Sequence, residues 1–123
     1  AARMAQIIGI VDAHLYMPLV RKAFVSGFDH PATRLVLDPA RCAEGIAEAQ
    51  PALSMLESIA AEGLQLNGQD ISLADLHLVP MIDYGFRVEG VRSACAPYTA
   101  LLGWWQSLSN RPSVINTDPL RPL

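Results

Sequence analysis

The sequence predicts an all-α fold, a single helical bundle of about five helices. Apolar residues recur at three- and four-residue steps in several stretches, and no stretch alternates apolar and polar residues as a half-buried strand does. Hydrophobic residues make up 51% of the 123 residues, and charged residues make up 17%. This composition excludes a disordered chain, and the length fits one compact domain over residues 1–123.

The first helix is expected from about Arg3 to Val25, and Gly27 is its expected end. Pro18 lies inside it and removes a backbone donor, at a cost of about 3 kcal/mol in a straight helix, so we expect a kink there. One face of this helix is apolar and is formed by Met4, Ile7, Ile8, Val11, Leu15 and Leu19.

A second helix is expected to begin at Asp38 and Pro39, after a loop over residues 26–37. The Asp38 carboxylate can accept from unpaired N–H groups, and proline suits the first helical position because its missing donor has no partner there. We expect this helix to run to Gly63, with a bend at Pro51.

Ser72 and Asp75 predict the start of a third helix. Their spacing is that of a capping box, although Glu or Gln is usual at the second position, and the flanking Ile71 and Leu76 predict a hydrophobic staple. The helix that follows is apolar nearly all round, which predicts a buried central helix. A hydrolytic triad of Ser72, Asp75 and His77 is the alternative. It lacks a G-x-S-x-G elbow, and positions three and five apart on one helix do not converge.

The closing part of the chain predicts a helix from Pro97 to about Asn110 and a short helical turn over residues 112–116. Trp104 and Trp105 are adjacent, so they point about 100° apart on this helix. We expect one indole to pack in the core and the other to face a groove or a partner.

Charge and residue spacing argue against several classes of function. A net charge of −3 disfavours a nucleic-acid partner. No stretch approaches the ~20 consecutive apolar residues that cross a bilayer, so no membrane contact is expected. The histidines His14, His30 and His77 lack metal-ligand spacing. Cys42 and Cys95 lie far apart without a C-x-x-C spacing, which predicts buried or partly buried thiols in a reducing cytoplasm rather than a disulfide or a zinc site.

Two stretches are more specific than the helical pattern. GQDISLADLHLVPMIDY, residues 68–84, joins a glycine-containing loop, an N-cap serine, an aspartate three residues on and an apolar helix. WWQSLSNRPSV, residues 104–114, joins a late helix to an Arg-Pro-x-Val sequence. Together with Pro18 and Pro51, these stretches resemble the C-terminal domain of cytosolic, bacterial-type glutathione S-transferases. The likeness runs from about residue 4 to residue 119.

The resemblance implies that a full-length parent protein is a glutathione transferase, which lowers the thiol pKa of glutathione and places the thiolate against an apolar electrophile. In that family the glutathione site and the catalytic Tyr, Ser or Cys lie in an N-terminal thioredoxin-like domain, which this sequence lacks. We therefore expect no catalytic residue, no metal and no cofactor in this chain, which alone is expected to be inactive. Glutathione is the expected co-substrate of the parent, and the parent is expected to be a homodimer.

The resemblance also implies where the electrophile binds. In the family this part of the first helix faces the cleft between the two domains, so His14, Tyr16 and Met17 are the expected substrate-binding residues. A phenol and a thioether are suitable linings for an apolar pocket. The alternative for Tyr16 and Met17 is ordinary packing within the bundle.

Two other functions remain consistent with the sequence. One is a non-catalytic glutathione-transferase-like module that docks other proteins, and the other is an unrelated bundle that binds an apolar ligand. A thioredoxin-like pattern upstream of residue 1, with an early Ser, Tyr or Cys, would favour the transferase.

Overall fold

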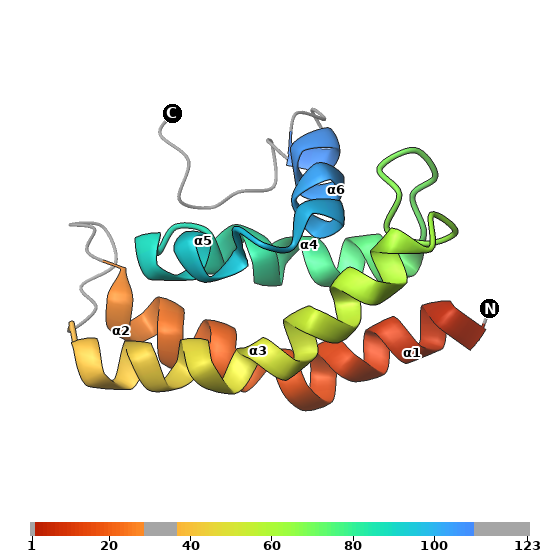
Figure 1. Ribbon diagram of the computed structural model, residues 1–123. Coiled ribbons are helices and arrows are strands. Elements are labelled where there is room, and N and C mark those ends of the chain that lie inside the picture. The colour runs from red at the N-terminus through yellow and green to blue at the C-terminus, as the bar shows by residue number, and fades with distance from the viewer. Residues whose placement is uncertain (1, 29–36, 110–123) are drawn as a thin grey trace, which may run out of the picture.

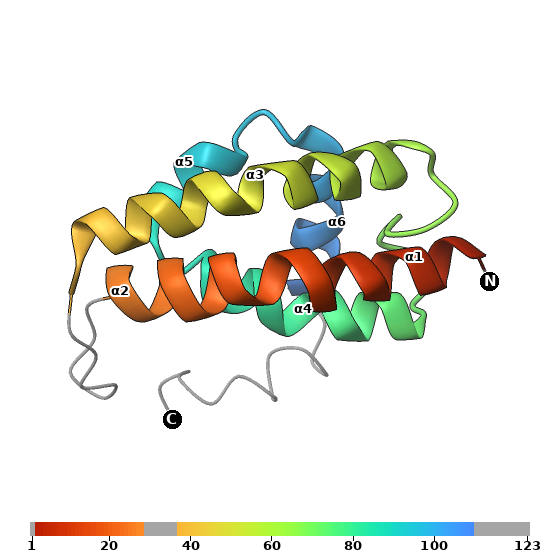
Figure 2. The same ribbon diagram turned by 90° about the horizontal axis from the view of Figure 1, so that it is seen from below.

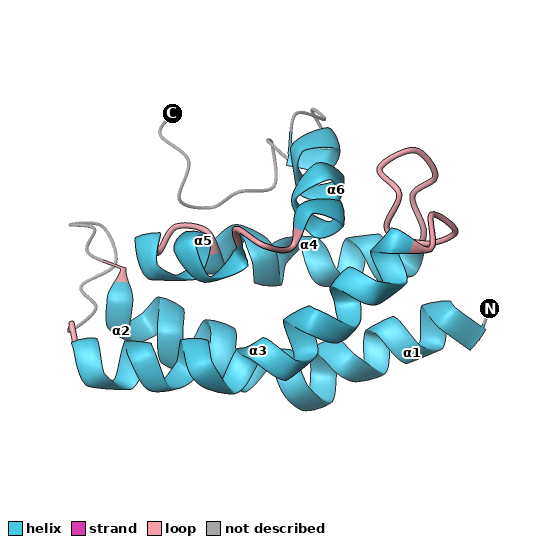
Figure 3. Ribbon diagram, in the orientation of Figure 1, coloured by secondary structure: helices cyan, strands magenta, loops and turns pink. Residues whose placement is uncertain are grey.

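The computed structural model describes residues 2–28 and 37–109, and within these ranges it contains helices and loops but no strand (Figures 1 and 3). This confirms the all-α prediction. Three segments follow one another without a break and form one rod, so the described residues make five helical rods. In order, the elements are α1 (Ala2–Ile10), η1 (Val11–Phe24), α2 (Val25–Gly27), α3 (Pro39–Ala61), α4 (Leu73–Gly85), α5 (Glu89–Cys95) and α6 (Thr99–Ser109).

The rod of α1, η1 and α2 organises the bundle. Seen from below, it runs between α3 on one side and α4 on the other (Figure 2), and η1 contacts both of these helices. Helix α6 stands steeply across the others in Figure 1 and packs against α3. The two sides of η1 are therefore covered by different helices, which leaves a third side for solvent.

The prolines change the helices in two ways. Val11–Phe24, which contains Pro18, is a π-helix. A proline ring clashes with the preceding turn of an α-helix, and the wider turn of a π-helix relieves that clash. The departure from straight α-helical geometry that Pro18 predicts is therefore a π-helix. In α3 the helix continues through Pro51, and Figure 1 shows it changing direction midway along its length, as the sequence predicts.

One apolar core joins all the rods. Glycines permit the closest contacts: a Cβ at Gly45 would lie 2.5 Å from the Pro18 carbonyl oxygen, and one at Gly85 would lie 2.9 Å from Leu19. Trp105 is half-buried and packs edge-on against Phe86. The largest fully buried side chains are Trp104, Ile7, Leu15, Leu19, Leu53, Leu56, Leu66, Leu78, Ile82, Leu101, Leu108 and Val11.

Helix α4 differs from the fully buried helix that the sequence predicts. It buries Leu78 and Ile82, but Leu73 is 65% and Leu76 59% exposed. Ile71, the expected partner of Leu76 in a hydrophobic staple, is also exposed. Apolar residues occur on every side of α4, but only one side is buried. The other side stays exposed because no described helix covers it.

The fifth helix also differs from the prediction. Helix α5 (Glu89–Cys95) has only seven residues, which are too few to show a clear apolar period, so the sequence pattern does not predict it. The predicted helical turn over residues 112–116 lies outside the described residues.

Candidate functional site

The three expected substrate-binding residues all lie on the solvent side of η1. His14 is exposed, Tyr16 is 39% exposed and Met17 is 55% exposed. Successive positions around a helix place Met17 between His14 and Tyr16. The opposite side of the same element is buried in the core through Val11, Leu15 and Leu19.

His14 lies at the edge of a groove between η1 and α3. The groove has a volume of about 430 Å³, which falls in the range of small-molecule sites. Tyr16 and Met17 are not among its lining residues, so the structure places only one of the three expected residues, His14, in this groove. We call it the η1–α3 groove, and it is lined by Ala13, His14, Pro18, Glu48, Pro51, Ala52 and Met55.

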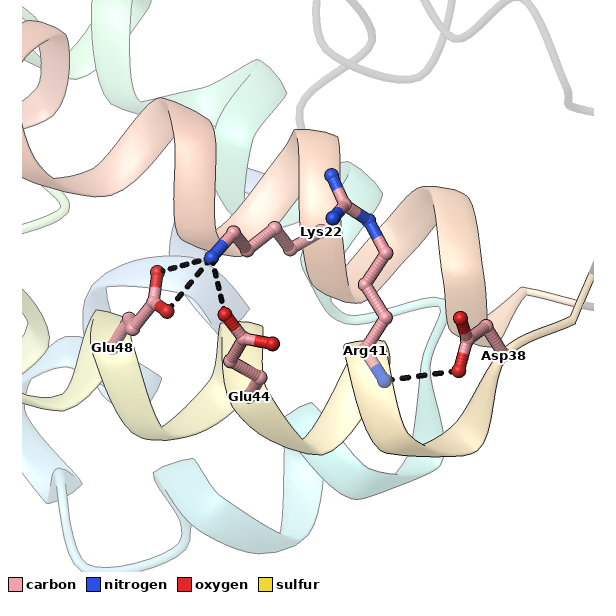
Figure 4. Close-up of polar contacts among 5 residues, drawn as sticks. All are labelled: Lys22, Asp38, Arg41, Glu44 and Glu48. Atoms are coloured by element: carbon pink, nitrogen blue, oxygen red, sulfur yellow. Dashed lines mark hydrogen bonds and ion pairs between the residues drawn. The ribbon is translucent and has the colours of Figure 1, made fainter.

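An ionic cluster joins η1 to α3 (Figure 4), and one of its members, Glu48, also lines the η1–α3 groove. The Lys22 ammonium donates to Glu44 Oε1 at 2.7 Å and to both Glu48 oxygens at 2.9 and 2.8 Å. The hydrogen bonds to Glu44 and Glu48 raise the pKa of Lys22 above its ordinary value. The bond from Lys22 likewise lowers the pKa of Glu44. The cluster therefore ties η1 to α3.

The opposite edge of η1 is joined to α4 by a polar pair. His77 Nε2 lies 2.6 Å from Asp12 Oδ1, and both side chains are partly exposed. His77 is half-buried and has a hydrogen-bond partner in Asp12. Its partner is 65 residues away, and no local pattern points to it.

Exposed apolar side chains flank this pair. Tyr16 lies one turn beyond Asp12 on η1, and Leu73 lies one turn before His77 on α4, so both are on the side where the two helices meet. Leu76 is next to His77 in sequence and is exposed as well. We call this surface the η1–α4 face, and it comprises Asp12, Tyr16, Leu73, Leu76 and His77.

The Ser72 and Asp75 pair serves the start of α4. Asp75 Oδ2 accepts from the Ser72 amide at 2.8 Å, and Ser72 Oγ accepts from the Ala74 amide at 3.2 Å. This confirms the capping box rather than a hydrolytic triad. The other Asp75 oxygen accepts from Trp104 Nε1 at 2.7 Å. The sequence pattern does not predict this link, although a buried indole N–H usually has an acceptor.

Neither cysteine is placed as a reactive thiol. Both are buried and free, as the sequence predicts. Burial raises the pKa of Cys42, which lines a second cleft of about 340 Å³, and raises the pKa of Cys95 to about 11. A nucleophilic thiol requires a lowered pKa, so neither has the setting of a catalytic residue.

Within residues 2–28 and 37–109, no three His, Cys, Asp or Glu side chains are grouped so as to hold a metal ion. None of the helices in this part of the chain is long and apolar enough to span a bilayer.

The chain was compared with known proteins. No curated protein and no solved structure matches it. A family model described as "Glutathione S-transferase, C-terminal domain" matches residues 15–112, which covers η1 from Leu15 onward and every later described helix. The helical rods and the capping box at α4 fit the resemblance seen in the sequence. The chain therefore belongs to the glutathione S-transferase C-terminal domain family.

Proposed function

We propose that this chain is the electrophile-binding half of a glutathione transferase, and that a thioredoxin-like domain on the same full-length protein binds and activates glutathione. The observation that carries the proposal is the exposure of His14, Tyr16 and Met17 on η1, outside the core of the bundle. A core-packing role for Tyr16 and Met17 would require burial. Their exposure favours contact with something outside the bundle.

In this proposal the electrophile lies on η1 and the second domain closes over it. Tyr16 and Met17 supply a phenol and a pliable thioether against its apolar part, and His14 supplies a polar edge. The exposed Leu73 and Leu76 on the η1–α4 face provide apolar area for the thioredoxin-like domain. The full-length protein acts in the cytoplasm as a homodimer and uses glutathione as co-substrate.

The side chains of this chain support the assignment of glutathione activation to the other domain. Among the described residues, Ser72 and Asp75 are engaged in the helix cap and the thiols are buried with raised pKa values. Conjugation needs a donor aimed at the glutathione sulfur, which these groups do not supply. The electrophile is then held by one domain and the nucleophile by the other.

A conjugation assay on this chain beside the full-length protein tests the proposal. We expect no turnover by the chain and measurable turnover by the full-length protein. In the latter, Tyr16→Ala, Met17→Ala and His14→Ala should each raise KM for the electrophile more than KM for glutathione, because they touch only one half of the site. Ser93→Ala, an exposed change on α5, is the control. Turnover by the chain alone at a comparable rate would refute the proposal.

A second candidate is a non-catalytic module that docks another protein. The observation in its favour is the exposed apolar area at Leu73 and Leu76, which suits a protein partner as well as a neighbouring domain. A full-length protein that forms a stable complex through this face and shows no conjugation would support this second function.

A further inference from the structure

A second cleft lies where the first rod ends and α3 begins. Residues of α2 form one wall, and the start of α3 with the residue two positions before it forms the other. The cleft has a volume of about 340 Å³, which falls in the range of small-molecule sites. It shares no described lining residue with the η1–α3 groove. We call it the α2–α3 cleft, and it is lined by Ser26, Gly27, Leu37, Pro39, Cys42, Ala43 and Ile46.

Close contacts hold the two walls of the α2–α3 cleft together. A Cβ at Gly27 would lie 2.5 Å from Cys42 Sγ and 3.0 Å from Val88 Cγ1, so a larger residue would displace one of them. The Asp38 amide donates to the Ser26 carbonyl oxygen at 2.8 Å, which ties the start of α3 to the end of the rod. The cleft is therefore preformed, and a ligand binds there without the cost of ordering these walls.

The lining of the α2–α3 cleft favours a neutral ligand. Most of its side chains are apolar, among them Leu37 and Ile46, and none of those described carries a charge. Burial raises the pKa of the Cys42 thiol above its ordinary value, which keeps this group neutral as well. Asp38 and Arg41 are close in sequence but do not line the cleft. A charged ligand group would lose water here without gaining an opposite charge from the lining.

Ser26 gives the α2–α3 cleft its one described hydroxyl group. The residue is buried, with 3% of its surface exposed. Its carbonyl oxygen is paired with the Asp38 amide, but its hydroxyl forms no hydrogen bond with any other described residue. Buried hydroxyls in folded proteins nearly always have a partner. Because Ser26 also lines the cleft, a ligand in the cleft can supply that partner.

We propose that the α2–α3 cleft binds small neutral molecules that combine an apolar body with one hydroxyl or carbonyl oxygen. The body lies against Leu37, Pro39 and Ile46, and the oxygen forms a hydrogen bond with the Ser26 hydroxyl. The site contains none of the residues assigned to electrophile binding, and it requires neither glutathione nor a second domain. The inference therefore stands or falls separately from the transferase function.

Four probes that share one phenyl ring test the ligand class on the unmodified chain. They are benzyl alcohol, toluene, anionic benzoate and benzylamine, which is a cation at neutral pH. We expect benzyl alcohol to bind about tenfold more tightly than either charged probe, because no described lining residue offers an opposite charge. Titrations followed by backbone amide chemical shifts should locate benzyl alcohol at residues 26–27 and 42–46.

Ser26→Ala separates the contribution of the hydroxyl from that of the apolar walls. This variant should bind benzyl alcohol about fivefold more weakly, the ratio that corresponds to one ordinary hydrogen bond. Its affinity for toluene should be unchanged, because toluene has no group for Ser26 to bind. The matched control is Ser54→Ala, an exposed change on α3 outside the cleft, which should alter neither affinity.

Ala43→Phe tests the location of the site independently. Ala43 lines the cleft and is exposed, so the added ring can occupy part of the cleft without entering the core. Both benzyl alcohol and toluene should then bind more weakly than to the unmodified chain. Circular dichroism checks that the three variants are folded.

The proposal fails if a charged probe binds the unmodified chain as tightly as benzyl alcohol, or if benzyl alcohol shifts no amides at the cleft. It also fails if Ser26→Ala weakens toluene as much as benzyl alcohol, or if Ala43→Phe leaves both affinities intact. Because the probe series uses the unmodified chain, a variant that does not fold leaves the main test intact.

Discussion

Asp75 is the charged residue most deeply embedded in the described structure. It is 1% exposed, and it accepts from the Ser72 amide, the Ser72 hydroxyl and the Trp104 indole. A buried carboxylate is tolerated only when its lone pairs are paired. One side chain therefore fixes both the start of α4 and the docking of α6.

Substitutions of Ser72 and Asp75 should lower the free energy of unfolding by different amounts. We expect Ser72→Ala to lower the free energy of unfolding by about 1 kcal/mol, as for other N-cap residues. Asp75→Ala should cost about 2–4 kcal/mol, because it strands the Trp104 and Ser72 donors. The double variant should lose less than the sum, since both residues serve one helix end. Chemical denaturation measures all three. Single-variant losses within about 0.5 kcal/mol, as at ordinary surface sites, would contradict the capping role.

The two thiols should be unreactive in the folded chain. A pKa of about 11 for Cys95 leaves on the order of 0.1% thiolate at pH 8, and burial blocks access as well. The pKa of Cys42 is also raised, so neither thiol gains from its surroundings. Ellman's reagent should react slowly with native protein and rapidly in guanidinium. Cys95 labelling at the same rate under both conditions would show that the assigned burial is wrong.

Helix α6 depends on a carboxylate from another element. Glu57, on α3, accepts from the Ala100 amide at 3.1 Å and the Leu101 amide at 2.8 Å, which satisfies two of the unpaired donors at the start of α6. A negative charge at a helix N-terminus is also favoured by the helix dipole. Helix α6 is thus capped by a residue more than forty positions earlier in the chain.

We expect Glu57→Ala to lower the free energy of unfolding by about 1–2 kcal/mol, in line with the loss of a cap. Amide hydrogen exchange should increase first in the opening turn of α6. The control is Glu62→Gln, which removes an exposed ion pair with Arg3 and should change stability by less than about 0.5 kcal/mol. Equal losses for the two variants would argue against a specific capping role for Glu57.

The sequence predicts well those helix boundaries that are determined by residues close to them in the chain. The starts of α3 and α4 were predicted because their caps, Asp38 and Ser72, act on amides two or three residues away. The sequence does not predict the pairing of Asp12 with His77 or the cap that Glu57 provides for α6. Both contacts join residues that are far apart in the chain and come together only in the fold. For the candidate site, periodicity and resemblance led to the exposed residues of η1, but the groove's second wall on α3 follows from packing alone.

At the scale of the whole molecule, exposed apolar side chains of two described helices gather on the η1–α4 face. On the η1–α4 face, Tyr16, Leu73 and Leu76 are all exposed, and no described element covers them. A surface of this kind in an isolated domain usually marks an interface. The chain on its own is therefore expected to expose this face to solvent.

The isolated chain should bind a hydrophobic dye or self-associate at micromolar concentration. Leu73→Gln combined with Leu76→Gln should reduce dye fluorescence and self-association, because it removes apolar area from the η1–α4 face. Leu64→Gln is the matched control, since Leu64 is 77% exposed in the loop before α4 and lies outside this face. Dye titration and sedimentation measure both effects. A monomeric chain without dye binding would show that the face is ordinary surface.

The hydrogen bond between Asp75 and Trp104 also sets the order in which the chain can fold during its synthesis. Asp75 leaves the ribosome 29 residues before its indole partner. Burying the carboxylate before then would leave an acceptor unpaired, at a cost of about 1–3 kcal/mol. The first three rods can form helices early, but burial of Asp75 between them is less favourable until Trp104 is present. The native core is therefore completed only when the last described helix has been made.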